Sequence, residues 1–181
     1  MSKPRGNKHI TAEYLRQVLS YCPTTGIFTW KYREDADKRW NIRYAGKRAG
    51  TYGSGGGSGN GYVHIFINCR GYGAHRLAWL YIHSEWPKHA IDHADSNGLN
   101  NAIGNLREAT YRENSYNRRI RSDNASGFKG VYWQKSHKKW GASIVANGKT
   151  TFLGLFGTAE EAHESYCIAA ERLHGKFARA A

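Results

Sequence analysis

Cysteine is scarce in this chain, and long apolar runs are missing from it. The 181 residues include only three cysteines, Cys22, Cys69 and Cys167. Their odd number and the lack of a Cys-x-x-Cys pair argue against a disulfide framework and against a four-ligand zinc knuckle. No apolar stretch approaches the length of a membrane span or a signal peptide. We therefore expect a cytoplasmic protein of one or two small domains that does not act in a membrane.

Acidic residues are also in short supply. The chain has 14 Asp and Glu against 27 Lys and Arg, a formal net charge of +13. Such an excess favours a polyanionic partner, most commonly nucleic acid, with a membrane surface or solubility alone as rivals. The excess is uneven, because residues 125–157 carry five lysines and no acid, whereas glutamates gather at 160, 161, 164 and 171. This segregation predicts a separate C-terminal domain with one basic face.

The N-terminal third shows patterns of a scaffold. Residues Thr11 to Tyr21 fit a short helix, and residues 27–32 and 62–68 alternate in the manner of strands. Between them, residues 46–61 include eight glycines, which is typical of a mobile loop. No Walker lysine follows that loop, so it is not a phosphate cradle. We expect residues 1–61 to support the module that follows.

The most informative polar residues are Asp92, His93, Asn105 and Asn114. Asp92 and His93 end a predicted short strand, and a loop dense in turn residues leads from there to Asn105 and a predicted returning strand. Thr110 and Glu113 fit a capping box, so Asn114 falls in the first turn of a helix. This order of strand, loop, strand and helix would bring one imidazole and two oxygen ligands together.

The ordered set resembles the HNH nuclease family, specifically the small phage-type HNH homing endonucleases. The residues that carry the resemblance are His75-Arg-Leu-Ala-Trp79, Trp86-Pro87, Ile91-Asp-His93, Asn100-Asn101, Gly104-Asn-Leu-Arg107 and Glu113-Asn114. Tyr21-Cys-Pro-Thr-Thr-Gly26 and Phe28-Thr-Trp30 also resemble the entry segment of these enzymes. The resemblance implies an α+β protein whose nuclease module, at residues 62–121, has the ββα-metal (His-Me finger) arrangement.

The resemblance also implies a role for each matching residue. His93 would be the general base, Asp92 and Asn114 the metal ligands, and Asn105 the brace of the loop that holds His93. A neutral imidazole can take a proton from the attacking water. One carboxylate and one amide make a weak cage for a hard cation, so a single Mg²⁺ or Mn²⁺ ion is expected, completed by DNA phosphate.

Three neighbouring polar residues need separate interpretations. His75 could touch a phosphate near the site, but local packing at the start of a helix is the favoured interpretation. Asp95 suits a turn-capping role, and His89 is not assigned to the site.

A second resemblance covers the C-terminal domain. Residues 128–133, 140–146 and 150–155 fit three short strands, and a capping box at Thr158 begins an amphipathic helix. Ser126-Gly-Phe-Lys-Gly-Val-Tyr-Trp133, Lys139-Trp-Gly-Ala142, Leu153-Gly-Leu-Phe156 and Ala159-Glu-Glu-Ala162 are similar to an AP2 DNA-binding domain. That family implies a three-stranded antiparallel sheet plus helix at residues 127–181, after a linker at 122–126.

In such a domain the sheet lies in the major groove of double-stranded DNA. The residues at the matching contact positions are Lys129, Tyr132, Lys139, Trp140 and Ser143. Trp133 and Phe152 could either enter the groove or pack in the sheet. Further phosphate contacts are expected from Arg107, Arg118, Arg119 and Arg121, although the last three could instead complement a helix dipole.

Together these patterns predict a site-specific endonuclease that hydrolyses a phosphodiester bond of double-stranded DNA. It would use one divalent metal, a histidine base and no small-molecule cofactor. One active site in a monomer predicts a nick in one strand. If the gene is carried by a phage, the protein would act in the cytoplasm of a bacterial host. The alternative is a sequence-specific DNA-binding regulator that does not cleave and whose HNH module is vestigial.

Overall fold

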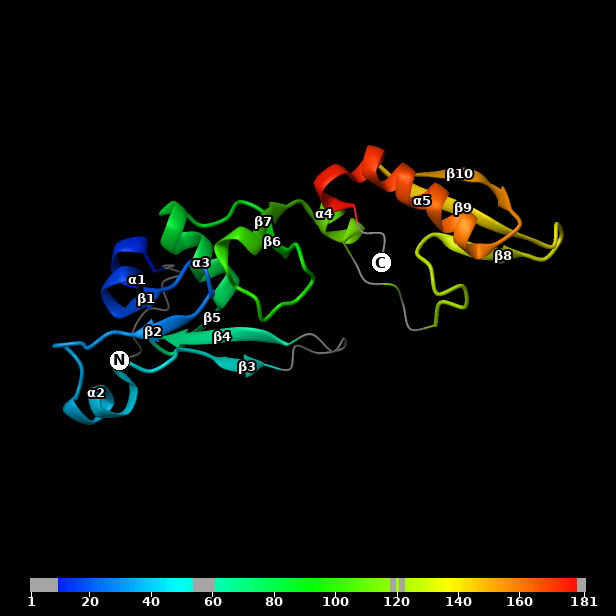
Figure 1. Ribbon diagram of the computed structural model, residues 1–181. Coiled ribbons are helices and arrows are strands. Elements are labelled where there is room, and N and C mark those ends of the chain that lie inside the picture. The colour runs from blue at the N-terminus through cyan, green and yellow to red at the C-terminus, as the bar shows by residue number, and fades with distance from the viewer. Residues whose placement is uncertain (1–9, 54–60, 118–119, 121–122, 179–181) are drawn as a thin grey trace, which may run out of the picture. The chain divides into compact units, whose positions relative to one another are not determined.

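A computed structural model describes residues 10–53, 61–117, 120 and 123–178 (Figure 1). The chain is a mixed helix and strand protein, and its internal contacts divide it into two compact units, Met1–Glu108 and Ala109–Ala181. This division falls inside the segment 62–121 that the sequence assigns to one module. The centre of the glycine-rich loop and Arg118, Arg119 and Arg121 lie outside the described residues. No helix within the described ranges is long and apolar enough to cross a bilayer.

The first unit begins with a short helix that runs straight into a hairpin. α1 (Ala12–Val18) starts after Thr11, whose side chain caps the helix. β1 (Leu19–Tyr21) then pairs antiparallel with β2 (Phe28–Trp30). The predicted helix to Tyr21 is therefore three residues too long, because those residues pair with β2. α2 (Lys38–Tyr44) follows the hairpin.

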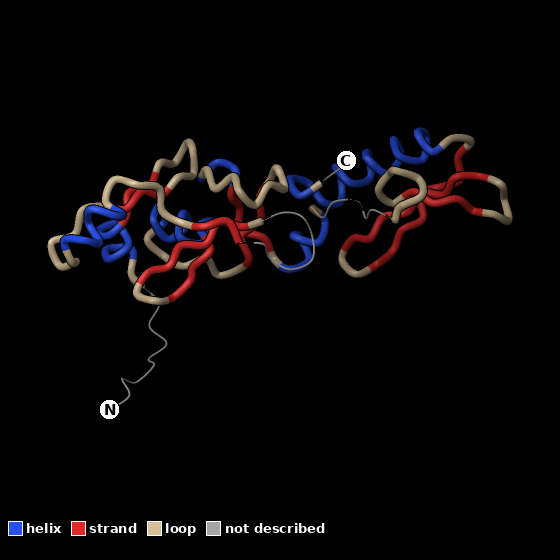
Figure 2. The backbone as a smooth tube through the Cα atoms, turned by 90° about the horizontal axis from the view of Figure 1, so that it is seen from below, coloured by secondary structure: helices blue, strands red, loops and turns tan. Residues whose placement is uncertain are grey.

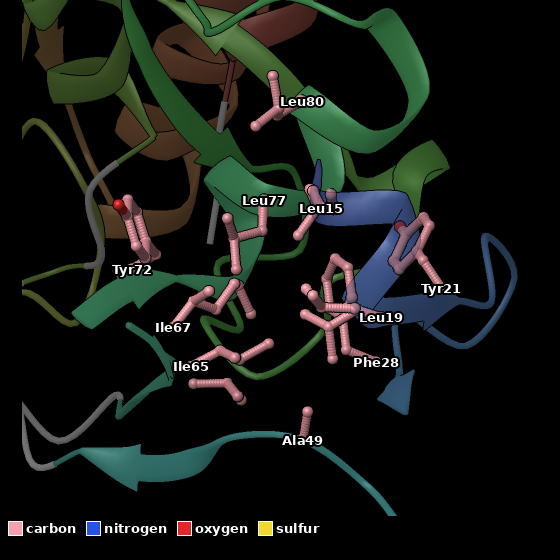
Figure 3. Close-up of a cluster of buried hydrophobic side chains, with 14 of the residues drawn as sticks. Leu15, Leu19, Tyr21, Phe28, Ala49, Ile65, Ile67, Tyr72, Leu77 and Leu80 are labelled. Atoms are coloured by element: carbon pink, nitrogen blue, oxygen red, sulfur yellow. The ribbon is translucent and has the colours of Figure 1, made fainter. Parts of the chain in front are cut away.

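A three-stranded antiparallel sheet and a helix complete the core of this unit. The strands are β3 (Thr51–Gly53), β4 (Tyr62–Ile67) and β5 (Arg70–Gly73), in the order β3-β4-β5. α3 (Ala74–His83) starts immediately after β5. Alternate residues of β4 are buried, as a strand with one face on the core requires. The core shown in Figure 3 unites Leu15, Leu19, Tyr21, Phe28, Ala49, Ile65, Ile67, Tyr72, Leu77 and Leu80.

The polar residues of interest sit on a second, smaller sheet. β6 (Ala90–His93) and β7 (Leu106–Ala109) form a two-stranded sheet. A loop and a short 3-10 helix, η1 (Ile103–Asn105), connect them. The burial of Ile91 and Leu106 joins this sheet to the core of the first unit.

The second unit opens with α4 (Tyr111–Tyr116). Its predicted capping box is confirmed: the Thr110 hydroxyl accepts the Glu113 amide proton, and the Glu113 carboxylate accepts the Thr110 amide proton. Tyr116 ends the helix and stacks on His174, with ring centroids 3.8 Å apart and planes 8° apart. The Tyr116 hydroxyl also accepts the amide proton of Asn147. α4 is thus fastened to the C-terminal unit.

The rest of this unit is one sheet covered by one helix. β8 (Val131–Gln134), β9 (Lys139–Ala146) and β10 (Lys149–Phe156) are antiparallel in the order β10-β9-β8. α5 (Ala159–His174) lies along one face of this sheet, as Figures 1 and 2 show, and the short η2 (Gly175–Phe177) ends the fold. The buried α5 residues Ala162, Tyr166 and Ala170 pack on the central strand, β9.

Local sequence signals account for most of these boundaries. The predicted capping box at Thr158 is confirmed. Asn147 and Gly148 both have positive φ, 52° and 77°, as a two-residue type I′ hairpin turn requires. The first strand begins three residues later than predicted. Gly130 has φ of 74° and lies against the ring of Tyr166, so the chain turns there before it enters the sheet.

Candidate functional site

Asp92 and His93 end β6 and both are buried. Their exposed fractions are 6% and 4%, which is unusual for a carboxylate and an imidazole in adjacent positions. Burial lowers the pKa of His93, whereas the hydrogen bond to Asn101 and the charges of Asp95 and Asp92 act in the opposite direction. The net shift keeps the imidazole neutral near pH 7, the form that can accept a proton.

Asp92 forms an ion pair with Arg107 of β7. The Nε and Nη2 atoms of Arg107 lie 2.8 and 2.7 Å from the same carboxylate oxygen, Oδ2 of Asp92. The strand pair β6-β7 brings these residues together. Arg107, which the sequence assigns to DNA contact, is only partly exposed and uses its guanidinium here to balance the buried carboxylate.

Asn101 holds the imidazole of His93. The Oδ1 atom of Asn101 lies 3.3 Å from Nε2 of His93, and its Nδ2 donates to the carbonyl oxygen of Leu99 at 3.2 Å. Because Nδ2 donates to Leu99, the side-chain oxygen faces the imidazole, and Nε2 of His93 must be the donor. The lone pair then resides on Nδ1. Asn101 belongs to the motif that carries the family resemblance, but spacing alone gives it no role.

The β1-β2 hairpin in turn holds Asn101. The Tyr21 hydroxyl donates to the carbonyl oxygen of Asn101 at 2.7 Å, and Pro23 accepts the amide proton of Ile103 at 3.0 Å. Gly26 has φ of 70° and packs so closely that a Cβ there would lie 2.2 Å from the carbonyl carbon of Asn101. Burial raises the pKa of Tyr21 to about 12, so its hydroxyl remains a donor.

Asn105 stabilises the loop between the two strands. Its side-chain oxygen accepts the amide proton of Asp95, and its Nδ2 donates to Oδ1 of Asp95 and to the carbonyl oxygen of Asn100. Burial alone would raise the pKa of Asp95, but hydrogen bonds from Asn97, Asn100 and Asn105 hold it below its usual value. Asn105 thus ties Asp95 to Asn100, and the role that the resemblance implies for Asn105 stays a prediction.

Three rings form a nearly equilateral group beside Asp92. The ring centroids of His75, Tyr62 and His93 are 5.4 to 5.8 Å apart. Burial, together with nearby charges, lowers the pKa of His75 to about 3. Two glycines leave room for the group. A Cβ at Gly73 would lie 2.7 Å from Cε1 of His75, and one at Gly98 would lie 2.9 Å from the ring of Tyr62.

The second predicted oxygen ligand, Asn114, is carried by α4 of the second unit. Its backbone amide donates to the carbonyl oxygen of Thr110 within the helix. Among the described residues, no group of three or more His, Cys, Asp or Glu side chains is placed to hold a metal ion. The two predicted ligands, the Asp92 carboxylate and the Asn114 amide, carry oxygen donors of the kind that Mg²⁺ prefers.

The sheet of the second unit has one face that α5 does not cover. The register pairs Tyr132 with Gly141 and Phe152 with Ser143. The buried Ala142 and Ile144 lie on the other face of the sheet. We call this surface the outer face. It includes Tyr132, Gln134, Lys139, Ser143, Val145, Thr150 and Phe152.

The predicted DNA contacts divide between the outer face and other places. Tyr132, Lys139 and Ser143 are on the outer face. Trp140 is on the opposite face, where it packs with the core beneath α5 and lies 5.1 Å from the ring of Trp133. Lys129 precedes β8, and its Nζ donates to the carbonyl oxygen of Tyr116. Of the two ambiguous aromatics, Phe152 is on the outer face and 56% exposed.

Comparison with known proteins matches two families. The model of the HNH endonuclease family matches residues 72–116, and that of the AP2 domain matches residues 126–176. Protein 3.8 of Escherichia phage T7 is 38% identical over 106 residues, 58% of this chain and 87% of that protein. A mimivirus protein named uncharacterized HNH endonuclease L560, from Acanthamoeba polyphaga mimivirus, is 40% identical over 88 residues, 49% of this chain and 44% of its own length.

The C-terminal part has a plant relative. The AP2-like ethylene-responsive transcription factor ANT of Arabidopsis thaliana is 45% identical over 56 residues, 30% of this chain but only 10% of the plant protein. No solved structure matches the chain.

Proposed function

Because this chain belongs to the HNH endonuclease family and carries an AP2 domain, we propose that it is a site-specific nuclease that nicks double-stranded DNA. The AP2-like sheet would select the site, and the sheet β6-β7 would carry the catalytic base. With α4, those two strands would make the ββα-metal arrangement of the His-Me finger. We assign one active site to each monomer, hence one cut strand, in the cytoplasm of a bacterial host.

The observation that carries this proposal is the fixed orientation of His93. Asn101 accepts the proton of Nε2, so Nδ1 is the nitrogen that takes a proton from the attacking water. The loop that presents Asn101 is itself braced by Asn105 and Tyr21. A base held in one tautomer and one orientation is what in-line attack on a phosphate requires.

We assign Asp92 and Asn114 as ligands of one Mg²⁺ or Mn²⁺ ion, the type of metal that HNH nucleases generally use. When bound, such an ion would neutralise charge on the scissile phosphate and on the leaving 3′ oxygen. Asp92 suits this role chemically because it offers a carboxylate oxygen, the type of ligand that Mg²⁺ prefers, and Arg107 lies 2.7 Å from Oδ2 of that carboxylate. Asn105 contributes by holding Asp95 and Asn100, and so the loop that carries Asn101.

For DNA recognition we assign Tyr132, Lys139 and Ser143 of the outer face. Lys139 supplies charge for phosphate, and the exposed rings of Tyr132 and Phe152 supply contact area. Trp140 and Lys129 would support the sheet from beneath and from its entry turn. Phosphate contacts from Arg118, Arg119 and Arg121 remain part of the proposal.

A plasmid assay tests the catalytic assignment. Supercoiled plasmid carrying the DNA that flanks the gene is incubated with purified protein in Mg²⁺ or EDTA, and relaxed circles are counted. Nicking is expected in Mg²⁺ only. We expect His93→Ala to abolish it, whereas His89→Ala, at an exposed position four residues away, should nick at the normal rate. Metal-dependent nicking that survives in His93→Ala would refute the mechanism.

One observation favours the alternative function of a regulator that binds DNA without cutting it. The carboxylate of Asp92 already has a guanidinium as its partner, and a structural ion pair needs no metal. Specific binding of wild-type protein to the same DNA, without nicking in Mg²⁺ or Mn²⁺, would establish that alternative.

A further inference from the structure

His75 has no role in the chemistry described so far, although it lies beside the catalytic base. Its ring centroid is 5.4 Å from that of His93, and the two planes meet at 68°. Tyr62 closes the group from the other side, with its centroid 5.5 Å from that of His75. A side chain at this distance from the base is within reach of the phosphate that the base must approach.

The two nitrogens of His75 differ in their surroundings. Nδ1 is enclosed and has no hydrogen-bond partner. Nε2 is not enclosed in that way, and the described part of the chain provides no partner for it either. Since an enclosed N–H without an acceptor is costly, the single proton of the neutral ring belongs on Nε2. His75 therefore presents one unused donor on the open side of its ring.

The chain keeps space for this ring at the expense of a side chain. Gly73 has φ of −66°, which any residue can adopt, so backbone strain does not explain the glycine. A Cβ at this position would come within 2.7 Å of Cε1 and 3.2 Å of Nδ1 of His75. The lack of a side chain at Gly73 thus makes room for the imidazole of His75, and this packing positions Nε2.

We propose that His75 is a second catalytic histidine, which donates a hydrogen bond from Nε2 to a non-bridging oxygen of the scissile DNA phosphate. It keeps its proton throughout, so no bond is made or broken at His75. The donor would stabilise the charge that grows on the phosphate as His93 takes the proton of water. The low pKa of His75 agrees with a ring that acts in its neutral form. The inference rests on the proposed nuclease function.

Three variants separate donation from packing. His75→Phe keeps a ring and removes the donor, His75→Gln offers an amide N–H near the position of Nε2, and Gly73→Ala displaces the ring. For His75→Phe we expect single-turnover nicking to slow on the order of 10²-fold, as for loss of one preorganised donor. His75→Gln should recover part of that loss. DNA affinity and melting temperature are measured for every variant, and His89→Phe is the exposed control.

The outcomes are distinct. Slow nicking by His75→Phe with normal DNA affinity, partly restored in His75→Gln, supports the proposal. Slow nicking by Gly73→Ala supports the role of Gly73 in positioning the ring. Nicking by His75→Phe at the wild-type rate would overturn it. Equal losses in the Phe and Gln variants, accompanied by lower melting temperatures, would also overturn it, since packing alone then explains His75. Failure of wild-type protein to nick would instead refute the nuclease function and the inference with it.

Discussion

Asn101 serves the candidate site with both of its polar groups. Its side chain orients His93, and its backbone carbonyl accepts the hydroxyl of Tyr21. Both contacts are buried, so each lacks competition from water. The orientation of the base therefore depends on a tyrosine 80 positions away in the chain.

This dependence yields a test at Tyr21. Tyr21→Phe should lower the free energy of unfolding by about 0.5–1.5 kcal/mol, plus the cost of the unsatisfied carbonyl. It should also slow nicking, because Asn101 loses its anchor. Tyr14→Phe, which removes an exposed hydroxyl contact to Asn68, should change stability by less than about 0.5 kcal/mol. Equal effects in urea unfolding of the two variants would contradict the assignment.

A second test at the residue scale uses pH. The pKa of His75 is about 3 in the folded protein, against an ordinary value of 6.5. Between these pH values the unfolded chain therefore binds a proton at His75 and the folded chain does not. The contribution of His75 to the free energy of unfolding is therefore fully present above pH 6.5, and it is lost as the pH falls toward 3. Each such proton contributes a slope of about 1.4 kcal/mol per pH unit. His75→Gln should remove one proton's share of that slope, and exposed His83→Gln should not.

Not all of the site could be inferred from the order of the residues. The positions of Asp92 and His93 at the end of a strand follow from local patterns. The pairing of Asp92 with Arg107 depends on how β6 and β7 associate. The contact between Tyr21 and Asn101 depends on packing between segments that are 80 residues apart in the chain. The availability of Nε2 of His75 as a donor depends on which atoms surround the imidazole ring. These are tertiary properties, which spacing does not encode.

At the scale of elements, short-range signals predicted the second unit well. Both capping boxes and the Asn147-Gly148 turn involve residues within a few positions of one another, so the sequence specifies them. The early strand start at Phe128 was wrong because Gly130 turns against Tyr166, a residue of α5. Longer-range packing decides such boundaries.

The attachment of α4 to the second unit is testable through its two tyrosines. Tyr116→Ala removes the stacking on His174 and the contact to Asn147, so we expect a loss of about 2–3 kcal/mol in unfolding free energy. Tyr111→Ala, at a residue that is 82% exposed, should be nearly neutral. Thermal denaturation compares the two, and similar melting temperatures would show that α4 is not fastened there.

At the scale of the whole molecule, the charge of +13 should govern DNA affinity. Contacts to six to ten phosphates would reduce affinity roughly 10³- to 10⁵-fold between 50 and 200 mM salt. Lys139→Ala should reduce the slope of log K against log salt by about one, because an outer-face charge is lost. Lys149→Ala, whose register partner Ala146 faces α5, is the control. Fluorescence anisotropy over a salt series measures both, and an unchanged slope for Lys139→Ala would remove it from the interface.

The hairpin that holds Asn101 bears on how the nuclease could be transplanted. The HNH match starts at residue 72, yet Tyr21, Pro23 and Gly26 support the loop that orients the base. A graft cut at the family boundary would carry His93 without its anchor. A transferable nuclease segment therefore has to include the β1-β2 hairpin, which lies well before the start of the family match.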